Sequence, residues 1–93
     1  MTAESMLRAF GRADSAGLSQ QDLHFLCAVA ANPGVKLADI AKEMRVTPPV
    51  ATRCRVRIPA AWLDVKNADG RAFAISLSKL GRRHLDSFFE EDL

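Results

Sequence analysis

The apolar residues in the first third of the chain recur at intervals of three and four positions, which is the spacing of an amphipathic helix. Residues 3–14 form the first such segment, and its apolar face consists of Ala3, Met6, Leu7, Phe10 and Ala13. A second segment follows Ser19, whose hydroxyl can form a capping-box variant with the carboxylate of Asp22. Its apolar face consists of Leu23, Leu26, Cys27 and Ala30, and the sequence Asn-Pro-Gly at residues 32–34 ends it. The pattern predicts two helices before residue 35.

Residues 38–58 contain two further helical signals separated by a tight turn. A helix of about two turns is predicted from near residue 38 by Leu37, Ile40, Ala41 and Met44. Thr47 then offers a hydroxyl to cap a new helix, and Pro48 and Pro49 occupy its first turn, where no intrahelical N–H is needed. Pro59 lacks an N–H and would clash with the preceding turn. We therefore predict a helix over residues 47–58.

The arginines at every second position of residues 53–57 also allow a strand, with Arg53, Arg55 and Arg57 on one face. Paired prolines are unfavourable directly before a central strand, so the helix is the favoured interpretation. In a helix, the residues that gather on the core side are Val50, Ala51, Cys54 and Ile58. The residues that project from the opposite side are Pro49, Thr52, Arg53 and Val56, with Arg55 and Arg57 on the flanks.

After Trp62 the hydrophobic period changes from helical to alternating. The runs "WLDVK" and "AFAISLS" flank the turn signal "NADGR", which predicts a β-hairpin with an Asp-Gly tip. The stretch "SKLGRRHLDSFFEEDL" then predicts a final helix that carries Leu85, Phe88 and Phe89. The predicted fold class is mainly α with a small β-hairpin wing (α+β). This order is a winged helix-turn-helix of about five helices and a two- to three-stranded sheet.

At 93 residues, of which 48% are hydrophobic and 26% charged, the chain has the size and composition of one small globular domain. We expect a single domain over residues 1–93, with a helix in 1–17, a winged-helix core in 18–85 and an acidic tail in 86–93. No apolar run is long enough to span a membrane. The N-terminal residues carry acids and arginines where a signal peptide has an apolar block, so the expected location is cytoplasmic.

The formal net charge of +2 hides a strongly basic segment. Residues 45–85 contain nine Lys or Arg residues and two acids, a difference of +7, whereas residues 86–93 contain four acids and no base. A basic block gathered on one face is typical of a surface that binds a polyanion. A solvated basic surface without a partner is the alternative.

The sequence contains no motif of a catalytic or metal site: no nucleophile elbow, no phosphate-binding glycine loop and no C-x-x-C. Cys27 and Cys54 are far apart and suit buried positions, with a thiol redox switch as the alternative. His24 and His84 are lone histidines on predicted helices. We therefore predict a protein that is not an enzyme and uses no metal or cofactor.

From about Leu18 to Leu85 the chain resembles the MarR (multiple antibiotic resistance regulator) family of bacterial winged-helix transcription factors. The similarity rests on "LSQQDLHFLCAVAANPG", on "LADIAKEMRVTPPVATR" and above all on "DGRAFAISLSKLGRRHL". The last run is similar to the family's wing, where Asp-x-Arg leads through an apolar strand into Leu-Ser/Thr-x-x-Gly. Those positions are here Asp69, Arg71, Leu77, Ser78 and Gly81. The resemblance implies a small transcriptional regulator that binds double-stranded DNA sequence-specifically.

The same resemblance makes residues 47–58 the recognition helix in the major groove and residues 66–73 the wing on the backbone or minor groove. Arg71 would contact DNA from the wing, and Asp69 would orient it. The predicted DNA-binding residues are Thr47, Pro49, Thr52, Arg53, Arg55, Arg57, Lys66 and Arg71. Family members dimerise through terminal helices, which implies a homodimer formed through those of this chain. The sequence leaves open whether a small-molecule effector binds.

A second interpretation is a winged helix that binds protein without binding DNA. An apolar contact patch rimmed by arginines would then consist of Val56, Trp62, Phe88 and Phe89. Val56 by itself could meet a thymine methyl group or a protein partner. Binding to DNA that weakens steeply with salt would separate the two interpretations.

Overall fold

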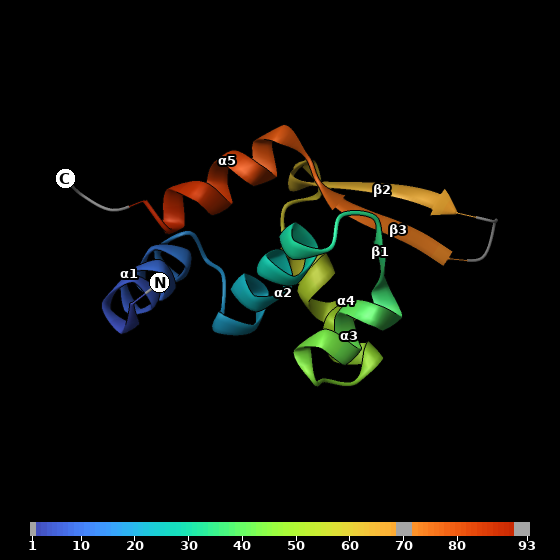
Figure 1. Cartoon of the computed structure of the whole chain (residues 1–93), viewed down its shortest axis with the longest axis horizontal. Helices are drawn as coiled ribbons and strands as arrows, with labels where there is room; N and C mark the ends of the chain where they lie inside the picture. Colours follow the sequence, from blue (N-terminus) through green and yellow to red (C-terminus); the bar gives the residue numbers. More distant parts are fainter. Residues whose placement is uncertain (1, 69–71, 91–93) are drawn as a thin grey trace.

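The computed structural model of the chain describes residues 2–68 and 72–90. In chain order its elements are α1 (Ala3–Ser15), α2 (Gln20–Ala31), β1 (Val35–Lys36), α3 (Leu37–Met44), α4 (Pro48–Arg57), the 3-10 turn η1 (Ala60–Trp62), β2 (Leu63–Ala68), β3 (Ala72–Leu77) and α5 (Lys79–Phe88). The prediction of a mainly helical winged helix-turn-helix is confirmed. Figure 1 shows the hairpin of β2 and β3 projecting from one end of the helical body, while α1 and the last turn of α5 lie at the other end.

The wing belongs to an antiparallel sheet with the strand order β1-β3-β2. Val35 of β1 and Val65 of β2 both pair with Ile75 of β3, whose side chain is fully buried. β1 is only two residues long, so it left no alternating pattern in the sequence, although a third strand was within the predicted range. The sheet therefore anchors the base of the wing to the segment that leads into α3.

The predicted capping box at the start of α2 is confirmed. The hydroxyl of Ser19 accepts a hydrogen bond from the N–H of Asp22 at 3.2 Å, and the Asp22 carboxylate accepts one from the N–H of Ser19 at 2.9 Å. Asp22 is fully buried, so this carboxylate needs further partners inside the protein.

Thr47 occupies the N-cap position of α4, but the predicted side-chain cap is wrong: its hydroxyl makes no capping hydrogen bond. Pro48 and Pro49 lack the N–H groups of the first two helical positions. The first available donor, the N–H of Val50, bonds instead to the carbonyl oxygen of Thr47 at 3.0 Å. The prolines therefore set the start of α4 by their own geometry.

α2 lies at the centre of the core, and its side chains are buried almost all around the helix. Leu23, Phe25, Leu26 and Val29 are at most 1% exposed, and α1, α3, α4 and α5 all contact this helix. A helix that is apolar on all sides is typical of such a central position.

The apolar face predicted for α1 is wrong in part. Its buried residues are Ser5, Ala9 and Ala13, whereas Leu7 is 69% exposed. Small side chains at these positions allow α1 to pack closely against both α2 and α5, while Met6 and Phe10 line a hollow beside α2 and Leu7 faces solvent.

The start of α5 packs directly against the backbone of η1. Ser78 caps α5 by accepting a hydrogen bond from the N–H of Gly81 at 3.0 Å, and its own hydroxyl donates to the carbonyl oxygen of Ala61 at 2.6 Å. The N–H of Ser78 donates to the carbonyl oxygen of Trp62 at 2.9 Å. Gly81 faces this same carbonyl, and only a residue without a β-carbon fits there.

Candidate nucleic-acid interface

The turn between α3 and α4 is closed by backbone hydrogen bonds around Arg45. This residue adopts the left-handed conformation, with φ 57° and ψ 44°. Its N–H donates to the carbonyl oxygen of Lys42 at 3.1 Å, and the N–H of Val46 donates to that of Ala41 at 3.0 Å. Such a left-handed closing residue ends one helix sharply and redirects the chain. α3, the turn and α4 thus form the helix-turn-helix unit.

α4 has the predicted orientation. Ala51, Cys54 and the following Ile58 are buried, and Val50 is partly buried. The exposed residues opposite them are Pro49, Thr52, Arg53 and Val56. The outer face of α4, defined by these four residues, is available to a ligand as large as a DNA duplex.

Two residues of this face carry polar groups suited to a base or phosphate. Arg53 is exposed and forms no hydrogen bond or ion pair with the described parts of the chain, so its guanidinium can turn toward a ligand. The hydroxyl of Thr52 donates to the carbonyl oxygen of Pro48 at 3.0 Å and retains its acceptor capacity. Thr47, also exposed, lies one turn earlier. The roles of these residues in DNA binding stay predictions.

Arg57 forms an ion pair within the protein that the sequence did not predict. Its Nη2 lies 2.9 Å from Oδ1 of the buried Asp22, and its Nε donates to the same carboxylate at 3.0 Å and 3.1 Å. Nη2 also contacts Sγ of Cys54 at 3.6 Å. The side chain of Arg57 is 45% exposed, so its outer edge still faces solvent. Arg57 therefore ties α4 to α2, and its contact with DNA stays a prediction.

The environment of Asp22 keeps this carboxylate ionised. Burial raises the pKa of Asp22, but hydrogen bonds from Arg57 and from Ser19 outweigh that effect and hold the pKa below its ordinary value. The pair joins residues 35 positions apart in sequence, and no periodic pattern marks such a contact.

The remaining predicted contacts lie on the flank of α4 and on the wing. Arg55 is partly buried and takes part in interactions within the chain. Lys66 is exposed on β2. Arg71 and Asp69 fall outside the described residues, so the predicted contact at the tip of the wing is untested.

The basic segment is not gathered on a single face, contrary to the simplest expectation from its charge. In Figure 1, α5 and the α3–α4 unit lie on either side of α2. Lys79, Arg82 and Arg83 are on α5, where they line the same shallow hollow as Asp86 and Glu90. Of the described bases in residues 45–85, Arg53, Arg55 and Arg57 are on α4 and Lys66 is on β2.

The apolar patch of the protein-binding interpretation does not exist as a surface. Val56 is 77% exposed, but Trp62 is only 8% and Phe88 only 5% exposed. The Trp62 ring stacks on His84 with ring centroids 4.3 Å apart and lies 6.2 Å from the ring of Phe88. These aromatic residues anchor α5 to η1, because the fold brings the hairpin's base and the last helix together.

The two cysteines have the character of structural residues. Cys54 is fully buried in α4, and Cys27 is partly buried in α2. Burial raises the pKa of both thiols, so they stay protonated at neutral pH, where a thiolate would be the reactive form.

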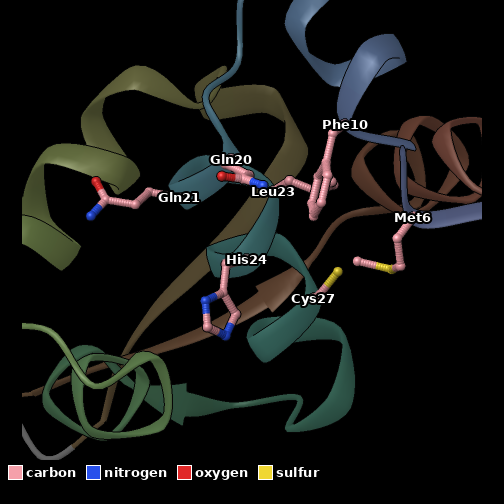
Figure 2. Close-up of a pocket in the computed structure, with 7 residues that line it drawn as sticks. All are labelled: Met6, Phe10, Gln20, Gln21, Leu23, His24 and Cys27. Carbon is pink, nitrogen blue, oxygen red and sulfur yellow. The ribbon is translucent and has the colours of Figure 1, made fainter. Parts of the chain in front are cut away.

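A separate hollow of about 420 Å³ lies between α1 and α2, away from the outer face of α4. Figure 2 shows Met6 and Phe10 of α1 extending toward Cys27 and Leu23 of α2. Within residues 2–68 and 72–90, no cluster of His, Cys, Asp or Glu is arranged to hold a metal ion. None of the described helices combines the length and apolar character needed to cross a membrane.

No protein-family model matches the chain, and there is no match among curated proteins. Solved structures are nevertheless similar. The multiple antibiotic-resistance repressor MarR from Listeria monocytogenes is 25% identical, with a TM-score of 0.71 over 87% of this chain and 56% of its own. MepR, a transcription regulator of the Staphylococcus aureus multidrug efflux pump MepA, is 20% identical, with a TM-score of 0.76 over 91% and 65%.

A structure of MepR in complex with DNA is also similar, with 19% identity and a TM-score of 0.77 over 91% of this chain and 73% of that protein. The chain spans less than two thirds of the length of the two repressor structures described first. Their identity to this chain is low, but the structural match covers 87–91% of it. The chain therefore has the winged-helix fold of the MarR-type repressors.

Proposed function

We propose that this chain is the DNA-binding part of a transcriptional regulator and binds double-stranded DNA sequence-specifically. In this proposal, α4 enters the major groove, and the wing, residues 66–73, contacts the backbone or the minor groove. The major groove admits one α-helix, and a two-stranded ribbon beside it can reach the neighbouring backbone. Enzymatic activity and a small-molecule effector are not part of the proposal.

The outer face of α4 is the observation that carries this function. It follows a tight turn, projects away from the core, and presents an exposed arginine, an exposed threonine hydroxyl and an exposed valine within one helical turn. This mixture of donor, acceptor and apolar groups matches the edges of base pairs in the major groove. The similarity in fold to MepR, which was solved in complex with DNA, supports the same use of the face.

We predict that Arg53→Ala lowers the preference for a specific duplex about tenfold. An arginine that donates two hydrogen bonds to a guanine contributes about 1–3 kcal/mol of discrimination, and alanine cannot replace it. A duplex enriched by in vitro selection and a scrambled duplex of equal length would be titrated by fluorescence anisotropy. The ratio of the two Kd values is the quantity to compare.

Two variants serve as controls for Arg53→Ala. Arg8→Ala removes the same charge from an exposed position on α1 and should leave the ratio unchanged. Arg71→Ala should weaken binding to both duplexes alike if the wing contacts only the backbone. An unchanged ratio in Arg53→Ala would show that this residue does not read bases.

Salt dependence provides a second prediction. If Arg53, Arg55, Lys66 and Arg71 each neutralise a phosphate or lie close to one, log Kd should rise by about 3 to 4 for each unit of log salt concentration. Lys66→Ala should reduce this slope by about one, whereas Arg8→Ala should not change it. Binding that is insensitive to salt would contradict a DNA interface and favour a protein partner.

A homodimer through the terminal helices remains part of the proposal. One such module buries only about 600–1,000 Å² on DNA, so useful affinity is expected from two copies on half-sites about one helical turn apart. α1 and α5 contact each other at the end of the molecule opposite to the wing (Figure 1). Sedimentation of the chain with and without the selected duplex gives the stoichiometry.

A further inference from the structure

Val56 is an exposed apolar side chain that does not contribute to the core. At 77% it has the largest exposed fraction among the exposed large hydrophobic residues of 2–66 and 74–90, the residues whose side chains the structure describes. It follows the fully buried Cys54 by two residues, a rotation of about 200° around the helix axis. The side chain therefore points almost directly away from the core.

Val56 also does not help α4 to form. A β-branched residue is a weaker helix former than alanine, and the largely exposed side chain of Val56 gains little from burial. Its neighbours one turn earlier are Thr52 and Arg53, both exposed. The outer face of α4 thus places an exposed apolar side chain beside a hydroxyl and a guanidinium, so a ligand bound to this face would complement Val56 best with an apolar group.

The surroundings of Val56 favour DNA over protein as that surface. A shallow hollow of about 400 Å³ beside it is lined by Arg55, Val56, Arg57, Ile58, Pro59, Ala60, Leu63 and Val65. Two of these residues are arginines and none is an acid. Arg57 pairs with Asp22, but together with Arg55 and the neighbouring Arg53 this end of α4 still carries a formal excess of positive charge. A polyanion is the partner whose charge complements it.

We infer that Val56 is a specificity-determining residue that contacts the 5-methyl group of a thymine in the major groove. This inference rests on the proposed function. The thymine methyl is the apolar group that base pairs display in the major groove, whereas phosphates offer none. Side chains one helical turn apart are about 5–6 Å apart, and successive base pairs rise by about 3.4 Å. The thymine therefore lies one or two base pairs from the base that Arg53 contacts.

Replacement of single thymines by deoxyuridine tests the inference, because only the methyl group is removed. With the duplex selected by the wild-type chain, one thymine per bound copy is expected to show a threefold to fivefold loss of affinity when replaced, on the order expected for one buried methyl group. Val56→Ala should bind the thymine duplex more weakly by a similar factor. At that position it should no longer distinguish thymine from deoxyuridine.

Val56→Ala is expected to fold, because alanine is the better helix former and no core contact is lost. Leu7→Ala, at an exposed apolar residue on α1 that does not line this hollow, is the matched control and should keep the full sensitivity to deoxyuridine. Circular dichroism of each variant confirms that the comparison is made on folded protein.

Each outcome has one interpretation. The thymine contact is wrong if no deoxyuridine replacement affects the wild-type chain, or if Val56→Ala keeps the wild-type sensitivity. Val56 would then be assigned to contact with a protein partner, and the proposal that the chain binds DNA would be unaffected. If selection enriches no duplex at all, the proposed function itself fails. Sensitivity that disappears only with Val56→Ala establishes the contact.

Discussion

Gly81→Ala is expected to lower the free energy of unfolding by about 3 kcal/mol. A β-carbon at this position would lie 2.1 Å from the carbonyl oxygen of Trp62 and 2.9 Å from its carbonyl carbon. Both are backbone atoms, so neither can rotate away as the end of a side chain would. The same carbonyl accepts the N–H of Ser78, and any shift of α5 would break this bond as well. Urea unfolding followed by circular dichroism measures the loss.

Gly11→Ala is the matched control for this prediction. Gly11 is exposed in the interior of α1, and a β-carbon there would have no heavy atom within 4 Å. Alanine should therefore raise the free energy of unfolding by about 0.5–1 kcal/mol, because it is the better helix former. The two glycines have the same chemistry and should give opposite signs. A small effect in both variants would mean that α5 can move away from η1 at little cost.

Asp22→Asn is expected to lower the free energy of unfolding by about 2–3 kcal/mol at neutral pH. The buried carboxylate accepts hydrogen bonds from the backbone of Ser19 and from two nitrogens of Arg57. Asparagine has one acceptor oxygen and an NH2 donor in place of the second. At least one hydrogen bond from Ser19 or Arg57 is therefore lost, and the buried NH2 group faces a donor in place of an acceptor. Hydrogen bonds to an ionised acceptor are also the stronger ones.

The pH dependence of this loss identifies the charge as its cause. Asp22 has a lower pKa in the folded chain than in the unfolded chain, so its contribution is fully present above about pH 4 and is lost as the pH falls through the folded-state value. The difference between wild type and Asp22→Asn should be constant from about pH 7 to pH 5 and shrink below about pH 4. Asp14→Asn, at an exposed position on α1, should differ little from wild type throughout. A loss that does not change with pH would point to packing and not to the carboxylate charge.

The Asp22–Arg57 pair also bears on recognition, because it fixes the end of α4 that lies next to Val56. Apolar contacts of Ala51 and Cys54 hold the middle of the helix, and the ion pair holds its last turn to the start of α2. A recognition helix has to keep its outer face in register with the bases, and a second anchor limits rotation about the helix axis.

Local signals along the chain predicted most of the fold. The Ser19–Asp22 capping box, the paired prolines and the Asp-Gly hairpin signal each depend on residues a few positions apart, so one sequence contains all the information they need. The orientation of α4 follows for the same reason, since helical geometry relates Cys54 to Val56 without reference to any other element.

Most of the features that the sequence misassigned or left open depended on contacts between distant segments. The helical period assigned Leu7 to the buried face of α1, but the packing of that helix leaves Leu7 69% exposed. Trp62 and Phe88 belonged to an exposed patch only in the alternative interpretation, and the packing of α5 against η1 buries both. Thr47 lost its predicted cap to the two prolines that follow it. Arg57 was placed beside DNA by its helical angle, and its pairing with Asp22 became visible only once α2 and α4 were brought together.

The sequence by itself determined where the helices and the hairpin begin and end and which side of α4 faces outward, because hydrogen bonds between near neighbours and the helical period decide these features. Only the tertiary structure decided which charges are committed within the fold and which stay exposed to a ligand. It also placed residue 81 against the backbone of Trp62, where only glycine fits. Both depend on how closely separate elements approach one another, and this distance is set by the packing of the whole core.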